Sequence, residues 1–203
     1  MEKLHAITIK DNEHFLRKKS EEVDFKKDNI KQYIDKLDEY FETSELTLAM
    51  AAVQLGIPKR IIYLKNTDIN IIERKQQGEE TESDLNHNER RILINPKIIY
   101  KKGLTEYWEA CASCLDYVGK VKRPYSIELT YYDINGKENK ELFTGFEATV
   151  LSHELDHLDG ILHIDIAEEV LEMNKEERKE FRKTHGYIII NTEEDYEKLK
   201  QGE

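Results

Sequence analysis

Apolar residues recur at helical spacing in two stretches of the 203-residue chain. Residues 29–41 carry them three and four positions apart, which predicts an amphipathic helix. Residues 144–160 repeat the pattern, with apolar residues at Ala148, Leu151, Leu155 and Leu158. Thr144 and Glu147 have the spacing of a capping box at the start of this helix, and Gly160 is suited to end it. A helix with such a stripe packs into a domain, so we expect its histidines, His153 and His157, to lie in the interior.

Shorter stretches rich in β-branched and aromatic residues predict strands. We expect these strands at residues 4–9, 60–64, 92–96 with a continuation to 100, 126–133 and 187–190. Asn135 and Gly136 form a strong hairpin signal. A charged loop, a charged helix and a polar, partly helical tail are expected at residues 12–23, 168–183 and 192–200. Strands come in runs and helices stand apart, so the prediction is an α+β fold. Mixed or antiparallel strands would pack around the helix at 144–160, with a C-terminal helix.

Length and composition favour a single domain over residues 1–203. Residues 66–90 are polar and acidic, which indicates a surface insertion rather than a domain boundary. The net charge of -11 argues against direct binding of nucleic acid, and no apolar run is long enough to span a membrane. The N-terminus lacks the apolar segment of a signal peptide, and two neighbouring cysteines do not make a disulfide scaffold. We therefore expect a cytoplasmic protein.

The chemistry of the chain is concentrated in His153-Glu154-Leu155-Asp156-His157. Two histidines four residues apart lie on one face of a helix, where both imidazoles can bind the same metal ion. Glu154 lies beside them and can transfer protons. Two histidines hold a metal poorly alone, so a third ligand is required. A catalytic site takes three protein ligands and keeps a position for water, whereas a structural zinc site takes four.

Three additions can complete this site, and they predict different functions. Cys111 alone would leave a catalytic centre, in which the metal lowers the pKa of a water and Glu154 moves the proton. The amide of Gln54 and the backbone N–H of Ala112 are then candidate donors to a developing oxyanion. Cys111 together with Cys114 would close a structural zinc site without catalysis.

The third addition is His163, because residues 153–163 spell the metzincin protease signature H-E-x-x-H-x-x-G-x-x-H. Metzincins also need a Met-turn downstream, and the later methionine, Met173, lies in a highly charged segment that suits a metal site poorly. The closed site has its own difficulty. Residues three apart on a strand point to opposite faces, so Cys111 and Cys114 converge only on a tight turn.

Three motifs in order resemble those of peptide deformylases. They are residues 47–54, which end in Gln54, residues 109–113 around Cys111, and residues 153–157. Further similar stretches lie at residues 15–19, 93–96, 121–124 and 158–162. The resemblance covers most of the chain. It implies metal-dependent removal of the N-formyl group from N-formylmethionyl peptides of nascent proteins, with release of formate.

The resemblance also implies a role for each site residue. The metal ligands would be Cys111, His153 and His157, holding Fe²⁺ in the cell with Zn²⁺, Ni²⁺ or Co²⁺ as substitutes. The general base and acid would be Glu154, and the donors to the formyl oxygen would be Gln54 and the Ala112 N–H. The binding partner would be the N-formylmethionyl peptide substrate, and direct binding to nucleic acid or to a membrane is not expected. The acidic tail at residues 193–197 makes docking to ribosomal RNA hard to support.

The first two motifs depart from the family pattern. The usual glycines are replaced by Thr47, Ala49 and Ala110, and Val53 stands where proline is usual. Ala112 replaces a leucine or similar residue, and Cys114 and His163 stand at positions that are more often apolar. Because Gly tolerates close approaches that Ala resists, Ala49 adds a methyl group where the peptide would pass. A divergent deformylase-like protein that acts on another acyl amide, or is inactive, is therefore the alternative.

Overall fold

The computed structural model describes residues 4–44, 47–65 and 90–202, and these fold around one long, bent strand. This strand, β3 (Arg90–Ala110), spans 21 residues, and different parts of it pair with different neighbours. The other strands are β1 (Ala49–Ala51), β2 (Ile61–Lys65), β4 (Tyr117–Arg123), β5 (Ser126–Tyr132), β6 (Glu138–Thr144), β7 (Glu169–Glu172) and β8 (Ile188–Asp195). All their ladders are antiparallel.

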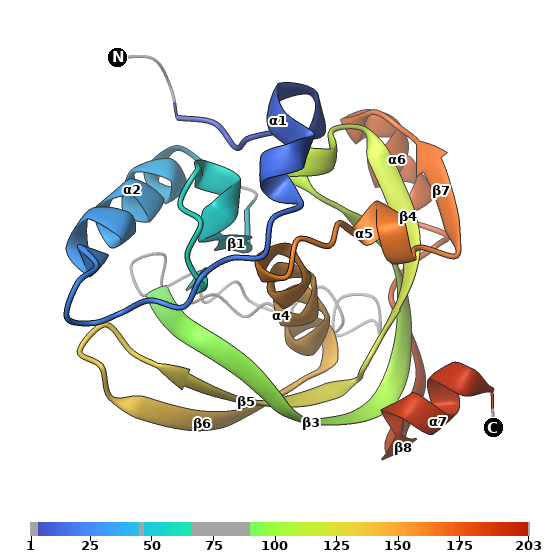
Figure 1. The fold of residues 1–203 in the computed structure, drawn as a ribbon. Helices are drawn as coiled ribbons and strands as arrows, with labels where there is room; N and C mark the ends of the chain where they lie inside the picture. The colour runs from blue at the N-terminus through green and yellow to red at the C-terminus, as the bar shows by residue number, and fades with distance from the viewer. Residues whose placement is uncertain (1–3, 45–46, 66–89, 203) are drawn as a thin grey trace.

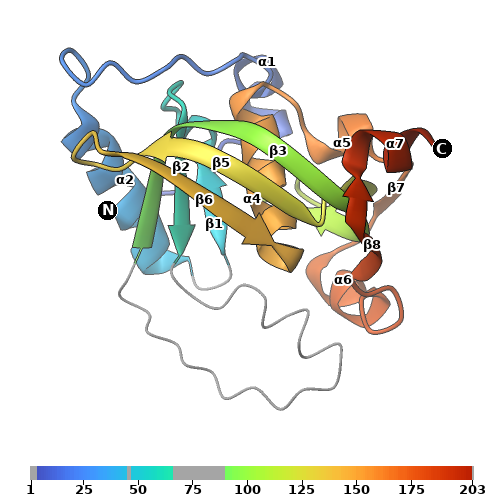
Figure 2. The same cartoon turned by 90° about the horizontal axis from the view of Figure 1, so that it is seen from below.

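The sheet has one continuous path with extra strands attached to β3. The path runs β1-β2-β3-β4-β7, while β5 and β8 also pair with β3 and β6 pairs with β5. The described helices are α1 (Ile9–Leu16), α2 (Ile30–Thr43), α4 (Gly145–Leu158), α5 (His163–Ile166), α6 (Lys175–Phe181) and α7 (Tyr196–Gln201), with 3₁₀ turns η1 (Ala52–Leu55) and η2 (Ala112–Cys114). The curved sheet surrounds α4 in Figure 1, and β3, β5 and β6 pass over it in Figure 2.

The bend of β3 depends on residues that leave the ordinary strand conformation. Its pairing register shifts beside Asn95, which has a φ of 51°, and again beside Gly103, with a φ of 70°. A Cβ atom at Gly103 would lie 2.4 Å from the Asn191 carbonyl oxygen of β8. Only glycine accepts both the left-handed conformation and this approach.

The core lies between α4 and the sheet. The apolar stripe of α4 packs against buried residues of five strands, which include Ala51, Ile62, Leu64, Leu93, Ile127, Leu129 and Phe143. Fully burying one such side chain stabilises the fold by roughly 2 kcal/mol. A second cluster lies under α2, where Ile34, Leu37 and Phe41 cover β1 and β2. The two predicted amphipathic helices are therefore the ones that organise the core.

The α+β fold, the antiparallel strands and the central helix are confirmed. The hairpin at Asn135–Gly136 is confirmed as the connection from β5 to β6, and the strand begun at residue 92 continues to residue 110. The C-terminal helix is present as α7, although residues 192–195 belong to β8. The predicted insertion lies outside the described residues except for Arg90, which begins β3. No described helix is long and apolar enough to cross a membrane.

Four local predictions are wrong. The predicted strand at residues 4–9 is absent, and the predicted loop at residues 12–23 begins inside a helix. The reason is that Thr8 and Asp11 form a capping box that starts α1. Residues 168–183 divide into β7 and α6, since Glu169–Glu172 pairs with β4. Thr144 is the N-cap of α4, but its side chain makes no capping hydrogen bond, and Glu147 binds Arg91 instead.

Candidate metal centre

Two elements, α4 and the end of β3, bring three ligand groups together. His153 and His157 come from successive turns of α4, and Cys111 follows directly after the end of β3. The Cys111 Sγ and His157 Nε2 atoms are 3.1 Å apart, and the two Nε2 atoms are 3.2 Å apart. We call these three residues the Cys-His-His site. All three ligand atoms lie within 4.8 Å of one another, as a metal site requires.

The donor set suits a divalent cation. One thiolate and two neutral imidazoles form a three-ligand site of the catalytic type. The ring of His153 is oriented for this role, because its Nδ1 is hydrogen-bonded to Glu109 Oε2 at 2.8 Å and its Nε2 faces the site. A carboxylate on the far ring nitrogen is the usual way to fix the tautomer of a metal-binding histidine. The geometry therefore fits one metal ion, without deciding which.

A buried ion pair holds Glu109 in place. The Arg123 guanidinium donates two hydrogen bonds to Glu109, at 2.8 and 3.0 Å, and a further one to Asp156 of α4. Burial by itself would raise the pKa of Glu109, but Arg123 and His153 outweigh it and hold this pKa well below its usual range. Glu109 is thus an anion that orients His153, and Arg123 ties β4 to β3 and α4.

Cys114 lies next to the site without belonging to it. It is fully buried on η2, and its thiol hydrogen-bonds to Cys111. That hydrogen bond, together with the neighbouring imidazoles of His157 and His153, outweighs burial and holds the pKa of Cys111 well below its usual range. The same contact, followed by burial, raises the pKa of Cys114. Of the two thiols, Cys111 is therefore the one that carries the negative charge.

The predicted proton carrier and amide donor both face the site. Glu154 is buried, and its Oε2 accepts the Ala51 N–H at 2.7 Å. Burial raises the pKa of Glu154, which suits a group that must both accept and release a proton. Gln54 is also buried, and its Nε2 lies 3.3 Å from Cys111 Sγ and 3.0 Å from Ser113 Oγ.

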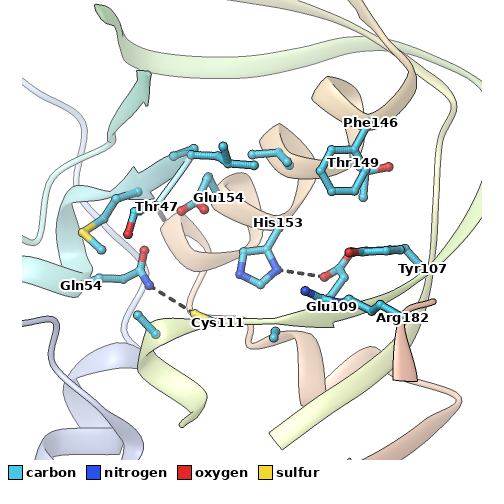
Figure 3. Close-up of a pocket in the computed structure, with 16 residues that line it drawn as sticks. Thr47, Gln54, Tyr107, Glu109, Cys111, Phe146, Thr149, His153, Glu154 and Arg182 are labelled. Carbon is cyan, nitrogen blue, oxygen red and sulfur yellow. Dashed lines mark hydrogen bonds and ion pairs between the residues drawn. The ribbon is translucent and has the colours of Figure 1, made fainter. Parts of the chain in front are cut away.

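A pocket of about 290 Å³ opens beside the Cys-His-His site. It is lined by Thr47, Leu48, Ala49, Met50, Gln54, Tyr107, Glu109, Ala110, Cys111, Ala112, Phe146, Thr149, Val150, His153, Glu154 and Arg182. In Figure 3, Gln54 and Thr47 lie on one side of His153, and Tyr107 and Arg182 lie on the other. Every predicted site residue except His157 lines this pocket, and His157 completes the Cys-His-His site from the next turn of α4.

The two other completions of the site do not match the geometry. Among the described residues, the group able to hold a metal contains neither Cys114 nor His163. The Nε2 of His163 lies 3.2 Å from the Tyr117 carbonyl oxygen, and its ring packs 5.5 Å from that of His153. Burial lowers the pKa of His163 to about 4, so it is a neutral packing neighbour. Neither the closed zinc site nor the metzincin site is formed.

Sequence reasoning missed four residues that shape the site: Glu109 and Arg123, which form the buried ion pair, and Tyr107 and Arg182, which line the pocket. Glu109 could have been found, because residues two apart on a strand share a face and Glu109 precedes Cys111 by two. Arg182 has no such signal, since it follows α6 and reaches the pocket only through the tertiary fold.

The substituted positions of the first two motifs also lie at this pocket. Thr47, Ala49 and Ala110 line it, whereas Val53 is buried in the core and is 1% exposed. The extra side-chain atoms at three of these positions therefore face the pocket. The side chain of Val53, at the fourth position, instead affects how the core packs under β1.

An α+β sheet around a His-Glu-x-x-His helix, with a Cys-His-His site and a buried glutamate in one pocket, defines a metal-dependent hydrolase. The polypeptide deformylase family model matches residues 6–172. The chain belongs to this family, and its activity is that of a peptide deformylase.

Individual relatives agree. The chain is 33% identical over 168 residues to peptide deformylase 2 of Clostridium acetobutylicum, covering 83% of this chain and 98% of the relative. It is 35% identical over 170 residues to the peptide deformylase of Finegoldia magna, covering 82% and 90%. The solved structure of a probable peptide deformylase from Synechococcus phage S-SSM7 superposes with a TM-score of 0.65 at 34% identity, covering 80% of this chain and 98% of that one.

Proposed function

We propose that this deformylase removes the formyl group from N-formylmethionyl peptides of nascent proteins, and that it does so in the cytoplasm. Cys111, His153 and His157 would hold the metal, which we propose to be Fe²⁺, with Zn²⁺, Ni²⁺ or Co²⁺ as substitutes. A divalent cation in this site would lower the pKa of water and polarise the formyl carbonyl. The observation that carries the proposal is the convergence of these three ligand atoms beside Glu154 in one pocket.

Each residue then has a task in the reaction. A carboxylate oxygen of Glu154 takes the proton of the attacking water and delivers it to the leaving amine, for which its raised pKa is suited. Gln54 Nε2 and the Ala112 N–H donate hydrogen bonds to the formyl oxygen as negative charge develops there. Glu109 keeps the His153 ring in the orientation that leaves Nε2 toward the site.

The test is formate release from a formyl-Met tripeptide by protein purified anaerobically and loaded with Fe²⁺. Glu154→Ala should keep the metal and lower kcat by about 10²- to 10⁴-fold, because general acid–base catalysis contributes that much. Glu147→Ala is the matched control on the same helix, since Glu147 binds Arg91 away from the pocket. Full turnover by a metal-loaded Glu154→Ala variant would remove Glu154 from the mechanism.

One observation favours the alternative of another acyl amide. Ala49 and Ala110 both line the pocket, and each adds a methyl group relative to glycine. If they displace the formyl peptide, the same assay with acetyl peptides and formylated small amines would show a preferred substrate other than formyl-Met. A clear preference for formyl-Met peptides would exclude this alternative.

A further inference from the structure

The pocket extends away from the Cys-His-His site along α4. Phe146, Val150 and His153 lie on one face of α4 at helical spacing, and all three line the pocket together with Thr149. Tyr107 of β3 lies across from them, its ring 5.1 Å from that of Phe146. A formylated residue bound with its formyl group at the Cys-His-His site would place its own side chain in this part of the pocket, which we call the side-chain pocket.

Arg182 also lines this pocket, and its origin is unusual. It follows α6 (Lys175–Phe181), whereas the family model matches only residues 6–172. In Figure 3, the Arg182 side chain lies beside Tyr107 and Glu109. The family match therefore says nothing about this residue, and its role has to be read from its surroundings.

These surroundings hold the guanidinium firmly but leave it incompletely satisfied. Its Cζ lies 4.9 Å from the centre of the Tyr107 ring, and its Nη2 donates to the Trp108 carbonyl at 2.7 Å. Its Nε is buried and has no hydrogen-bond partner among the residues that the structure describes. Among the described residues no carboxylate forms an ion pair with Arg182, and nearby Glu109 is already occupied by Arg123 and His153.

A partly buried cation with an unused donor is costly, and an acceptor on the ligand would offset that cost. Burial lowers the pKa of Arg182, in keeping with incomplete solvation, although a guanidinium stays charged at neutral pH. The thioether of methionine is a weak acceptor, whereas an oxygen in the same place is a strong one.

We propose that Arg182 is a specificity-determining residue, which favours formyl peptides whose first side chain is unbranched, of methionine length, and ends in an acceptor oxygen. This inference rests on the proposed deformylase function. Two sources supply that chemistry: the sulfoxide of an oxidised formyl-methionine, and the carboxamide of glutamine. The Arg182 N–H groups would donate to the oxygen, while Tyr107 and Phe146 pack against the methylene chain.

The experiment compares formyl-X-Ala-Ser peptides in which X is norleucine, methionine, methionine sulfoxide or glutamine. Norleucine has the length of methionine without an acceptor and serves as the reference. In the Arg182→Met variant, kcat/KM for the sulfoxide or glutamine peptide relative to norleucine should fall at least about tenfold, because a charged donor is lost. The arm that falls identifies which of the two acceptors the pocket accepts.

Lys179→Met is the matched control, since Lys179 is an exposed cation on α6. It should leave the relative kcat/KM values unchanged, while Arg182→Met changes them. A ratio that stays within twofold in Arg182→Met would overturn the inference, even if formyl-methionine is hydrolysed normally. Arg182→Gln, which keeps a donor, is the second variant if Arg182→Met does not fold.

Calorimetric binding of the product tripeptides to the metal-loaded protein separates this inference from the proposed function. If no formyl peptide is hydrolysed, the proposed function fails. The relative affinity of Gln-Ala-Ser, Met sulfoxide-Ala-Ser and norleucine-Ala-Ser still decides the role of Arg182. A tenfold loss of this preference in Arg182→Met supports the inference, and equal loss in Lys179→Met overturns it.

Discussion

At the scale of single residues, Glu109 shows how much of a metal site lies outside its ligands. It accepts hydrogen bonds from both His153 and Arg123, and it is 4% exposed. Its two neighbours require different things from it: His153 requires a fixed ring orientation, and Arg123 requires a counter-charge. One carboxylate meets both needs, so the metal site and the packing of β4 on β3 depend on the same residue.

Glu109→Gln should therefore weaken metal binding by about 10- to 100-fold, because outer-shell partners of ligating histidines typically contribute that much. It should also lower the free energy of unfolding by about 3–5 kcal/mol, since Arg123 would keep only Asp156 as a counter-charge. Competition with a chromophoric chelator measures the first effect, and denaturant unfolding of the metal-free protein measures the second. Glu106→Gln is the control on the same strand, because its partner is the more exposed Lys120. Equal metal affinity in Glu109→Gln and wild type would contradict the orienting role.

The site residues that could be predicted from the sequence are those that belong to a short motif with a regular spacing. His153, Glu154 and His157 follow from helical spacing alone. The ligand atoms of His153 and His157 lie together with that of Cys111, and their role as metal ligands stays a prediction. The catalytic roles of Glu154, Gln54 and Ala112 stay predictions, as does the choice of metal. Arg182 could not be predicted, because its position depends on how the segment after β7 returns to β3.

At the scale of elements, strong apolar periodicity was a reliable guide and charged segments were not. α2 and α4 were predicted within two residues at each end. α1 was missed because Thr8 and Asp11, rather than a stripe of apolar residues, start it. β7 was missed because its residues become a strand only by pairing with β4, a contact between distant parts of the chain.

The bend of β3 gives a prediction for an element. Gly103→Ala should lower the free energy of unfolding by about 3 kcal/mol or more, because it adds left-handed strain to a 2.4 Å clash with the Asn191 carbonyl. Gly136→Ala is the matched control, since Gly136 has a φ of 77° and its added Cβ would meet only ordinary contacts at 3.5 Å. That variant should lose about 1–2 kcal/mol. Thermal unfolding of both proteins checks the difference, and equal losses would mean that the β3–β8 approach adds no strain of its own.

At the scale of the whole molecule, the N-terminal helix and the segment after α4 close over the Cys-His-His site from outside. Leu16 of α1 and Leu162 pack with Cys111 and Cys114 in one buried cluster. The single domain over residues 1–203 stays a prediction. In the described part of the chain, α1 and the segment after α4 contribute to the same buried cluster. The two cysteines of this cluster therefore stay buried on the side away from the pocket only while α1 packs against them.

The ion pair between Arg17 and Asp165 joins α1 to α5, and it predicts a dependence of stability on pH. Burial would raise the pKa of Asp165, but hydrogen bonds from Arg17 and the Leu162 N–H outweigh it and lower this pKa below its usual value of 3.8. A folded pKa below the unfolded one contributes stability above about pH 4, and that stability is lost as pH falls through the folded pKa.

Asp165→Asn should therefore lower the free energy of unfolding at pH 7 by at most about 1 kcal/mol, because the pair is partly exposed. The difference from wild type should shrink as the pH is lowered below 4, where the wild-type carboxyl also becomes neutral. Denaturant unfolding at pH 7, 5 and 3 measures this dependence. Asp35→Asn is the control, since Asp35 pairs with Lys31 within α2 and both side chains are exposed. If α1 docks through this pair, only Asp165→Asn should also expose Cys111 and Cys114 to a thiol reagent at neutral pH. An unchanged thiol reaction rate would mean that the apolar cluster alone holds α1 over the site.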